Sequence, residues 1–472
     1  MKRNMIKEPS ISNINEIINT LKESNRFHEI ETGAERKYLI ETYGCQMNEH
    51  DSEKLEGFLI QMGFNKTDSR ENADLIIFNT CCVRENAELK VYGKLGALKH
   101  LKKRHKDLII AVCGCMMQQD HVVKYIQKTY QHVDLIFGTH NLHNFPYLLG
   151  KTLQHKEAIV DVWNQEGDII EGLPINRRYG IKSFVNIMYG CNNFCSYCIV
   201  PYTRGRERSR EVSDVLEEIE DLVSNGSKEV MLLGQNVNSY GQTLENKMDF
   251  ADLLEEVVKI PGIERIRFMT SHPKDLSDKL IETMAKHQKI CNHMHLPLQA
   301  GGNKVLKEMN RKYTQEDYLN IVNKIKNKIP EVAITTDIII GFPNESEEDF
   351  EKTLQVAKTV EFDSAFTFLY SIREGTPAAT KTGQIPEGDK KRRFQTLKKL
   401  IDDIAYKNNQ KYLNREVSVL VEGISKKNKK VLTGRTETSK TVNFSGDESL
   451  IGEIVTVKIT SAKTYSFDGV IV

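Results

Sequence analysis

A loop with three closely spaced cysteines is the part of this sequence best suited to metal chemistry. Cys191, Cys195 and Cys198 follow a C-x3-C-x2-C spacing, directly after the apolar run Ser183–Met188. Three thiolates on one tight loop can hold three irons of a cubane, and no fourth cysteine follows nearby. Because iron–sulfur clusters are normally held by four thiolates, the fourth iron is left open to a substrate group. The loop therefore predicts a reducible cluster with a vacant coordination position.

Structural zinc is the alternative interpretation of the same loop. The C-x2-C pair Cys195 and Cys198 has a spacing that zinc sites use, but a structural zinc takes four ligands. It would need a further Cys or His at matching spacing. The ligand set favours a cluster over zinc.

The spacing, and the ending Cys195-Ser-Tyr-Cys198, resemble the radical S-adenosylmethionine (SAM) superfamily. The resemblance implies that the amino and carboxylate groups of SAM chelate the open iron. It also implies that one electron from the cluster cleaves the sulfonium to a 5′-deoxyadenosyl radical. Tyr197, the aromatic residue before the last cysteine, becomes a candidate cofactor contact.

Length and composition indicate the number of domains and the cellular compartment. A chain of 472 residues is long enough for about three domains. Its net charge of +1, with 28% charged residues, does not by itself indicate a nucleic-acid partner. Nine cysteines, an odd number, argue against a secreted disulfide framework and for metal ligation in a reducing compartment, hence the cytoplasm. Residues 1–36 are polar, without an apolar run for a signal peptide or membrane span, and predict a short amphipathic or flexible leader.

From Lys37 onward, short apolar runs alternate with helical stretches, which predicts a parallel open α/β sheet. The expected strands are Tyr38–Tyr43, Leu75–Phe78, Leu108–Val112 and Leu135–Phe137, and the expected helices are Asp51–Met62, Arg84–Arg104 and Gln118–Tyr130. Residues 151–178 predict an irregular connection.

A second set of cysteines lies where these strands end. Cys45 and Cys81 follow the first two strands, and Cys113 and Cys115 lie at the end of the third. Ligands of parallel sheets bind beyond the carboxyl ends of the strands, where adjacent strand ends converge. We therefore expect Cys45, Cys81 and Cys115 to form a second three-thiolate site.

The remaining cysteines have a simpler interpretation. Cys113 sits inside the strand run, and Cys82 is expected to point away from its neighbour Cys81. Free cysteines are often buried small apolar residues, which we expect of Cys82, Cys113 and Cys291.

Three motifs around the second set resemble the methylthiotransferases, radical-SAM enzymes with an auxiliary 4Fe-4S cluster in an N-terminal domain. They are Tyr43-Gly-Cys-Gln-Met-Asn48, Asn79-Thr-Cys-Cys-Val-Arg-Glu-Asn-Ala-Glu88 and Cys113-Gly-Cys-Met-Met-Gln118. The family pattern takes one cysteine from each motif, which matches Cys45, Cys81 and Cys115. The resemblance covers residues 37–472 and implies an N-terminal methylthiotransferase domain at 37–155, a radical-SAM domain at 177–410 and a C-terminal domain at 411–472.

The β/α pattern resumes after the cysteine loop and predicts a partial (β/α)6 barrel with its site at the strand C-termini. The expected strands are Glu229–Leu233, Arg265–Met269, His293–Leu296, Ala333–Ile340 and Ser364–Tyr370, besides the one before Cys191. Polar and glycine residues at the strand ends make Gln235, Asn236 and Gly341 candidate SAM contacts. The loop Pro201–Arg210 holds four arginines in seven positions and could draw a phosphate-bearing substrate.

A basic helix, Lys390–Asn409, leads into short alternating strands from Arg415 to Val472, which predict a five-stranded OB-like β-barrel. Its first loop, Ser425-Lys-Lys-Asn-Lys-Lys430, is basic. This part resembles the TRAM domain of tRNA-modifying enzymes, which implies an RNA substrate.

Within the methylthiotransferases, the chain is most similar to members that act on N6-isopentenyl(dimethylallyl)adenosine of tRNA, beside the anticodon (position 37). The residues behind this choice are Gly44-Cys-Gln-Met-Asn48, Ser183-Phe-Val-Asn-Ile-Met-Tyr-Gly190 and Leu233-Gly-Gln-Asn-Val-Asn-Ser-Tyr240. The resemblance implies two SAM molecules and two 4Fe-4S clusters: one SAM methylates a sulfur at the auxiliary cluster, and the other yields the radical that removes hydrogen from C2 of the adenine. It further implies an electron donor such as flavodoxin or ferredoxin, no membrane, and a monomer.

Three other interpretations stay open on the sequence. A methylthiotransferase acting on threonylcarbamoyladenosine tRNA is the nearest. A non-catalytic iron–sulfur electron carrier would use the cysteines but needs neither the barrel nor the basic C-terminal module. An RNA-binding protein with structural zinc would leave Cys45, Cys81 and Cys115 unused.

Overall fold

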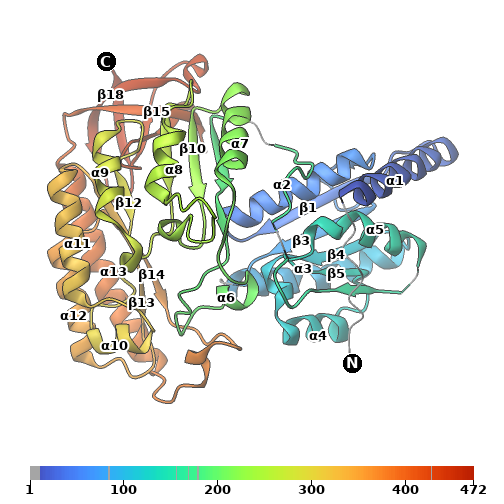
Figure 1. Cartoon of the computed structure of the whole chain (residues 1–472), viewed down its shortest axis with the longest axis horizontal. Helices are drawn as coiled ribbons and strands as arrows, with labels where there is room; N and C mark the ends of the chain where they lie inside the picture. Colours follow the sequence, from blue (N-terminus) through green and yellow to red (C-terminus); the bar gives the residue numbers. More distant parts are fainter. Residues whose placement is uncertain (1–10, 83–84, 156, 168, 178–179, 427) are drawn as a thin grey trace. The chain divides into compact units, whose positions relative to one another are not determined.

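The computed structural model describes residues 11–472 except 83–84, 156, 168, 178–179 and 427 (Figure 1). The chain forms two compact units. The N-terminal unit comprises Met1–Arg178 and Ile199–Arg206, and the C-terminal unit comprises Tyr179–Cys198 and Glu207–Val472. Among the described helices, none has the length and apolarity needed to cross a membrane.

A six-stranded parallel sheet forms the centre of the N-terminal unit, in the order β2-β1-β3-β4-β5-β6. Its strands are β1 (Lys37–Tyr43), β2 (Asn65–Lys66), β3 (Leu75–Thr80), β4 (Ile109–Cys113), β5 (Leu135–Phe137) and β6 (Ile159–Asp161). The helices are α1 (Ile11–Thr32), α2 (Gln46–Gln61), α3 (Glu85–Arg104), α4 (Asp120–Thr129), α5 (Phe145–Gln154) and the short α6 (Val200–Thr203). The predicted parallel α/β sheet is confirmed.

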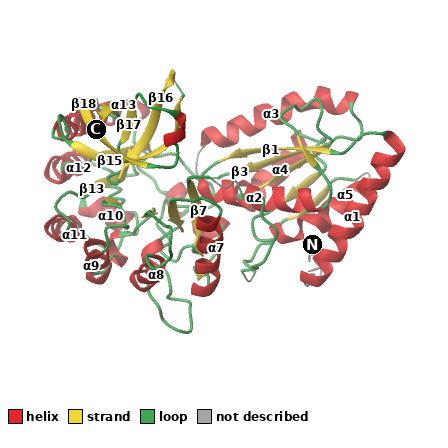
Figure 2. Cartoon of the chain, turned by 90° about the horizontal axis from the view of Figure 1, so that it is seen from above, coloured by secondary structure: helices red, strands yellow, loops and turns green. Residues whose placement is uncertain are grey.

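Helices cover both faces of this sheet, which explains the continuous apolar runs of its strands (Figure 2). In β3, Leu75 and Ile77 join the core formed with α1, α2 and α5. Ile76 and Phe78 join the core formed with α3 and α4. The strand register therefore fixes which side chains at the carboxyl edge of the sheet point to which face.

Several elements of this unit are absent from the sequence prediction, among them β2, α5 and α6 and two elements in stretches predicted without regular structure. Residues 159–161, inside the stretch predicted as irregular, form β6 and pair with β5; three residues are too few for a periodic signal. Residues 11–32, inside the predicted flexible leader, form α1, whose Ile14, Ile18 and Leu21 are buried in the core. Residues 1–10 of the leader lie outside the described residues.

Six parallel strands form the partial barrel of the C-terminal unit, as predicted. They make two three-stranded sheets, β7-β10-β11 and β12-β13-β14, joined by the parallel bridge between Ile266 and Ile290. The strands are β7 (Lys182–Asn186), β10 (Glu229–Leu233), β11 (Arg265–Phe268), β12 (His293–His295), β13 (Ala333–Ile340) and β14 (Ser364–Leu369). The helices are α7 (Val212–Ser224), α8 (Phe250–Val257), α9 (Asp278–Lys286), α10 (Asn303–Glu308), α11 (Gln315–Lys328), α12 (Glu347–Val360) and α13 (Glu387–Gln410); β8 (Met188–Tyr189) pairs with β9 (Arg208–Ser209).

The same unit ends in a closed five-stranded barrel, in the order β15-β16-β17-β19-β18, which confirms the predicted small β-barrel. Its strands are β15 (Glu416–Ser425), β16 (Asn428–Thr436), β17 (Thr441–Phe444), β18 (Ile454–Ala462) and β19 (Phe467–Ile471). Two arginines of β11 attach it to the partial barrel. Arg265 donates to the carbonyls of Arg435 and Ser418, and Arg267 donates to those of Thr436 and Glu437.

Replacing Arg267 by alanine is expected to lower the free energy of unfolding by about 3–5 kcal/mol. The Arg267 guanidinium pairs with Glu229 at 2.9 Å, and both side chains are almost fully buried, so the variant leaves a buried carboxylate without its cation. Chemical denaturation measures the change. The control is Arg392→Ala, which breaks an exposed pair with Glu347 and is expected to change the free energy of unfolding far less. Equal losses in both variants would contradict this account.

Candidate active site

The loop with Cys191, Cys195 and Cys198 is held by hydrogen bonds to its backbone. The amide of Cys198 donates to the carbonyl of Cys195 at 2.9 Å. Phe194 adopts a positive φ of 46°, and the side chain of Asn310 donates to its carbonyl at 2.9 Å. The loop is thus fixed before any ligand arrives, in a backbone conformation that a non-glycine residue seldom adopts.

Further contacts tie the loop to the partial barrel. The Ser196 amide donates to the carbonyl of Met309 at 2.9 Å, and its hydroxyl donates to the carbonyl of Glu308 at 2.8 Å. Glu207 accepts from the amide of Asn192 at 3.1 Å. Burial raises the pKa of Glu207, although this hydrogen bond works in the opposite direction.

A buried arginine lies against the middle cysteine. Arg311 donates from Nη1 to Sγ of Cys195 at 3.4 Å, from Nε to the Tyr313 hydroxyl at 2.9 Å and from Nη2 to the carbonyl of Pro297 at 3.1 Å. Burial opposes the charge on Arg311, but Tyr313, Tyr197 and Cys195 together raise its pKa well above the usual value. A fixed positive charge therefore lies 3.4 Å from the sulfur of the middle cysteine.

The three thiols suit an iron–sulfur cluster better than free acid–base chemistry. Burial raises the pKa of Cys191 to about 11, so this thiol stays protonated at neutral pH until a metal replaces the proton. None of the three forms a disulfide. Among the described residues, no three Cys, His, Asp or Glu side chains are gathered as one metal ion would require; the thiolates of a cubane each bind a different iron and need not meet at one point.

Of the candidate SAM contacts, Tyr197 packs against the barrel core, and burial raises its pKa well above the usual value. Gln235 lies half-buried directly after β10. Asn236 is buried and its side chain joins two loops: it donates to Asp275 at 2.7 Å and accepts from the amide of His272 at 3.1 Å. Asn236 thus acts at least as a brace between the ends of β10 and β11.

His272, at the same loop mouth, is neutral. Burial, followed by the charges of Arg311 and Lys274, lowers its pKa to about 2. Its Nδ1 accepts from the amide of Lys274 at 3.2 Å. A neutral imidazole here serves as a structural acceptor rather than as a proton carrier near neutral pH.

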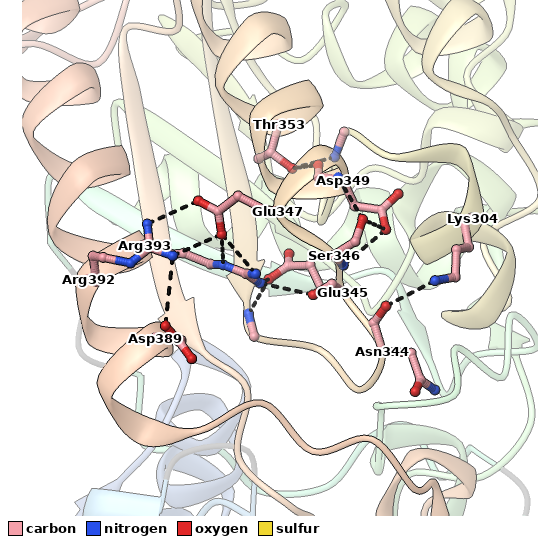
Figure 3. A network of polar contacts seen from close by, with 12 residues as sticks. Lys304, Asn344, Glu345, Ser346, Glu347, Asp349, Thr353, Asp389, Arg392 and Arg393 are labelled. Atoms are coloured by element: carbon pink, nitrogen blue, oxygen red, sulfur yellow. Dashed lines mark hydrogen bonds and ion pairs between the residues drawn. The ribbon is translucent and has the colours of Figure 1, made fainter.

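The fourth candidate, Gly341, sits in a tight turn after β13 with φ +76°. A Cβ at this position would lie 2.4 Å from Cγ of Lys390, so only glycine fits. Its amide donates to Oε2 of the buried Glu345 at 2.8 Å. The same oxygen accepts from Arg393 of α13 at 2.8 Å, within the polar network of Figure 3. The turn is therefore fixed by a carboxylate and a helix from the same unit.

Replacing Glu345 by glutamine is expected to change how stability depends on pH. Burial raises the pKa of Glu345, although the Gly341 amide and Arg393 lower it. An acid with a raised pKa binds more protons folded than unfolded, so wild-type stability falls as pH rises from about 4.3 through the raised value. Urea unfolding at a series of pH values should show the wild type losing stability relative to E345Q over this range. A difference that does not vary with pH would contradict the assignment.

Cys45, Cys81 and Cys115 come from the ends of three adjacent strands, and the structure brings them together. Cys45 precedes α2, Cys81 follows β3, and Cys115 begins the 3-10 turn Cys115–Gln118. A hydrogen bond with Cys81 is the largest influence on the pKa of Cys45 and raises it. The charge of Cys115 also acts on Cys45, and the charge of Cys81 acts on Cys115. The predicted convergence at the sheet edge agrees with this arrangement.

A buried amide network fixes the spacing of the first two motifs. Asn48 donates to Oδ1 of Asn79 at 3.1 Å, and Asn79 donates back to the carbonyl of Asn48 at 2.8 Å. Gly114 takes φ +95°, and a Cβ there would lie 2.5 Å from the carbonyl oxygen of Thr80. The third motif therefore requires glycine to approach the second. Val83 and Arg84 of the second motif lie outside the described residues.

The other cysteines are buried, as expected. Cys113 points into the core with α1, α2 and α5. The expectation that Cys82 points away from its neighbour is wrong: its thiol hydrogen-bonds with Cys115 and Cys81 and lies 3.6 Å from the Thr203 hydroxyl. The strand ends at Thr80, so side-chain alternation no longer separates residues 81 and 82.

Arg204 belongs to this site, whereas the sequence marked it only as one of four arginines in the loop Pro201–Arg210. It lies in the segment Ile199–Arg206, which packs with the N-terminal unit. Its Nε donates to Sγ of Cys115 at 2.9 Å, and its Nη2 pairs with Asp51 at 2.8 Å. The signal available in the sequence was only a run of alternate arginines.

Three family models match successive parts of the chain. Residues 37–138 match the uncharacterized protein family UPF0004, residues 185–357 match the radical SAM superfamily, and residues 410–472 match the TRAM domain. The first match contains Cys45, Cys81 and Cys115, and the second contains Cys191, Cys195 and Cys198.

A solved structure with a similar fold is a radical S-adenosylmethionine methyltransferase from Kitasatospora setae, with tryptophan substrate and a SAM analogue bound. Its TM-score is 0.54 at 14% identity, covering 73% of this chain and 75% of that one. At this identity the likeness concerns the fold alone.

Two sequence relatives are far closer. The tRNA-2-methylthio-N(6)-dimethylallyladenosine synthase of Alkaliphilus oremlandii is 59% identical over 468 residues, which are 99% of this chain and 98% of the relative. The enzyme of the same name from Acetivibrio thermocellus is 58% identical over 455 residues, 96% of this chain and 95% of the relative. With both cysteine sets inside the matched regions, the chain belongs to the radical-SAM methylthiotransferase family.

Proposed function

We propose that this protein replaces the hydrogen on C2 of N6-isopentenyladenosine, beside the anticodon of tRNA, with a methylthio group. The observation that carries this proposal is the 59% identity over almost the whole chain to an enzyme named for that product. The choice over threonylcarbamoyladenosine tRNA rests on the same relatives, since both carry the dimethylallyladenosine name.

The six strand-end and loop cysteines are proposed to hold two 4Fe-4S clusters. Cys191, Cys195 and Cys198 fit a SAM-binding cluster because they lie on one braced loop with a cation at Cys195. Cys45, Cys81 and Cys115 fit an auxiliary cluster because their thiols lie together at the sheet edge. When bound, SAM and the clusters supply radical and sulfur chemistry that side chains lack, since an aromatic C–H has no useful acidity.

The protein's own residues then bind and orient SAM and the tRNA. Tyr197, Gln235, Asn236 and Gly341 are proposed to line the SAM site at the mouth of the partial barrel. The TRAM barrel, with its basic loop around Lys426, Lys429 and Lys430, is proposed to bind the tRNA. We place the domain boundaries at 37–155, 177–410 and 411–472. We also propose a monomer that works in the cytoplasm with a flavodoxin or ferredoxin as electron donor.

Mass spectrometry of nucleosides from total tRNA tests the proposal, in cells that lack this protein and in complemented cells. The methylthio derivative of isopentenyladenosine should disappear while the unthiolated nucleoside accumulates, and complementation should restore it. If that nucleoside is unchanged and the threonylcarbamoyl counterpart loses its methylthio group, the substrate assignment is wrong. If neither changes, the reaction is wrong as well.

A further inference from the structure

A buried ion pair stands directly behind one cysteine of the N-terminal unit. Arg204, Asp51 and Cys115 are each 5–6% exposed. The guanidinium uses two different edges: Nη2 meets Oδ2 of Asp51 at 2.8 Å, and Nε meets Sγ of Cys115 at 2.9 Å. Its backbone amide donates to Val200 at 2.7 Å, which anchors the residue at the end of α6.

This arrangement suits a thiolate better than a thiol. A buried arginine is costly unless charge and hydrogen bonds compensate it, and the carboxylate of Asp51 compensates the Arg204 guanidinium in part. The N–H aimed at Sγ gains most when the sulfur carries negative charge, as a metal-bound cysteine does. The planar guanidinium can donate hydrogen bonds to a carboxylate and a sulfur at once in a fixed geometry, which a lysine ammonium cannot do.

We propose that Arg204 is a positioning residue that donates a hydrogen bond to the cluster ligand Cys115 and raises the reduction potential of the auxiliary cluster. The proposal rests on the auxiliary cluster of the proposed function. Hydrogen bonds to ligand sulfurs and the net charge nearby set the potential of an iron–sulfur cluster. A positive charge stabilises the reduced, more negative state, so Arg204 makes the cluster easier to reduce. Asp51 holds the guanidinium in place and partly offsets its charge.

The two partners therefore act on the potential with opposite sign. Removing the cation should make the cluster harder to reduce, whereas removing the carboxylate and leaving the cation should make it easier to reduce. A purely structural ion pair would not shift the reduction potential in opposite directions, because loss of either partner would damage the site in the same way.

The test uses the full chain with Cys191, Cys195 and Cys198 all replaced by alanine, so that only the auxiliary site can hold iron. In this background, Arg204→Met, Arg204→Lys and Asp51→Asn are reconstituted with iron and sulfide. Each is reduced stepwise with dithionite and followed by electron paramagnetic resonance. The matched control is Arg206→Gln, which removes an exposed arginine from the same loop.

At a fixed potential, R204M should show at least a tenfold lower ratio of reduced to oxidised cluster, equivalent to about 59 mV for one electron. R204K should lie between R204M and the unmodified Arg204, D51N should shift the other way, and R206Q should not move. If R204M fails to retain iron, R204K and D51N carry the same test through their opposite shifts.

Unchanged potentials in iron-loaded variants, or shifts of the same sign in R204K and D51N, would overturn the proposed role of Arg204. They would leave the auxiliary cluster itself untouched. If the background protein binds no cluster at all, the auxiliary cluster of the proposed function is wrong and this inference falls with it. Iron content before the titration separates the two failures.

Discussion

Replacing Cys191, Cys195 or Cys198 by alanine is expected to abolish the formation of 5′-deoxyadenosine from SAM. Each cysteine is proposed to hold one iron of the cluster that binds SAM, and alanine offers no ligand in its place. The loss should be complete, because without the cluster nothing in this loop can pass the electron from dithionite to SAM. Chromatography of reactions with SAM and dithionite measures the product.

Cys291 provides the matched control. It is a buried cysteine of the same unit, 2% exposed, outside both cysteine sets. Cys291→Ala should retain SAM cleavage within about twofold, equivalent to ~0.4 kcal/mol of activation free energy. Deoxyadenosine formed at the wild-type rate by any of the three loop variants would remove that residue from the cluster.

Replacing Cys45, Cys81 or Cys115 by alanine is expected to separate the two halves of the reaction. SAM cleavage should persist within about twofold, or ~0.4 kcal/mol, because the radical loop is intact. Formation of the methylthio nucleoside should stop, because the thiolates proposed to hold the sulfur-carrying cluster are incomplete. Deoxyadenosine and modified nucleosides are measured in the same reaction with tRNA.

Cys113→Ala is the control for this set. Cys113 lies two residues from Cys115, but its side chain belongs to the core with α1, α2 and α5. It should lose a little stability, on the order of 1 kcal/mol, and keep methylthiolation. Methylthiolation that survives in the Cys45, Cys81 and Cys115 variants would contradict the auxiliary site.

Periodicity and position along the chain predicted much of this molecule. The parallel sheet and the partial barrel follow from apolar runs separated by amphipathic helices. The grouping of Cys45, Cys81 and Cys115 follows from topology, because the carboxyl ends of neighbouring parallel strands share an edge. These inferences require only the order of the strands along the chain and the residues that follow each strand.

Other features depend on packing that a single sequence does not encode locally. Helix α1 is predominantly polar, and its few apolar side chains matter only because α5 and α2 receive them. Cys82 turns toward Cys115 because the chain leaves the strand at Thr80. The pairing of Arg204 with Asp51 spans 153 residues of sequence, and either residue alone resembles an ordinary surface charge.

The segment Ile199–Arg206 makes the N-terminal unit discontinuous in the amino-acid sequence. A fragment ending at residue 178 would carry the whole sheet but lack the guanidinium that compensates Asp51, a defect of about 3–5 kcal/mol if the carboxylate stayed buried. The unit therefore cannot be excised, exchanged between relatives or recombined as one continuous stretch without bringing eight residues from beyond Cys198. A change of Asp51 or Arg204 alone leaves the other charge buried without its partner. We therefore expect the two residues to change together across homologues.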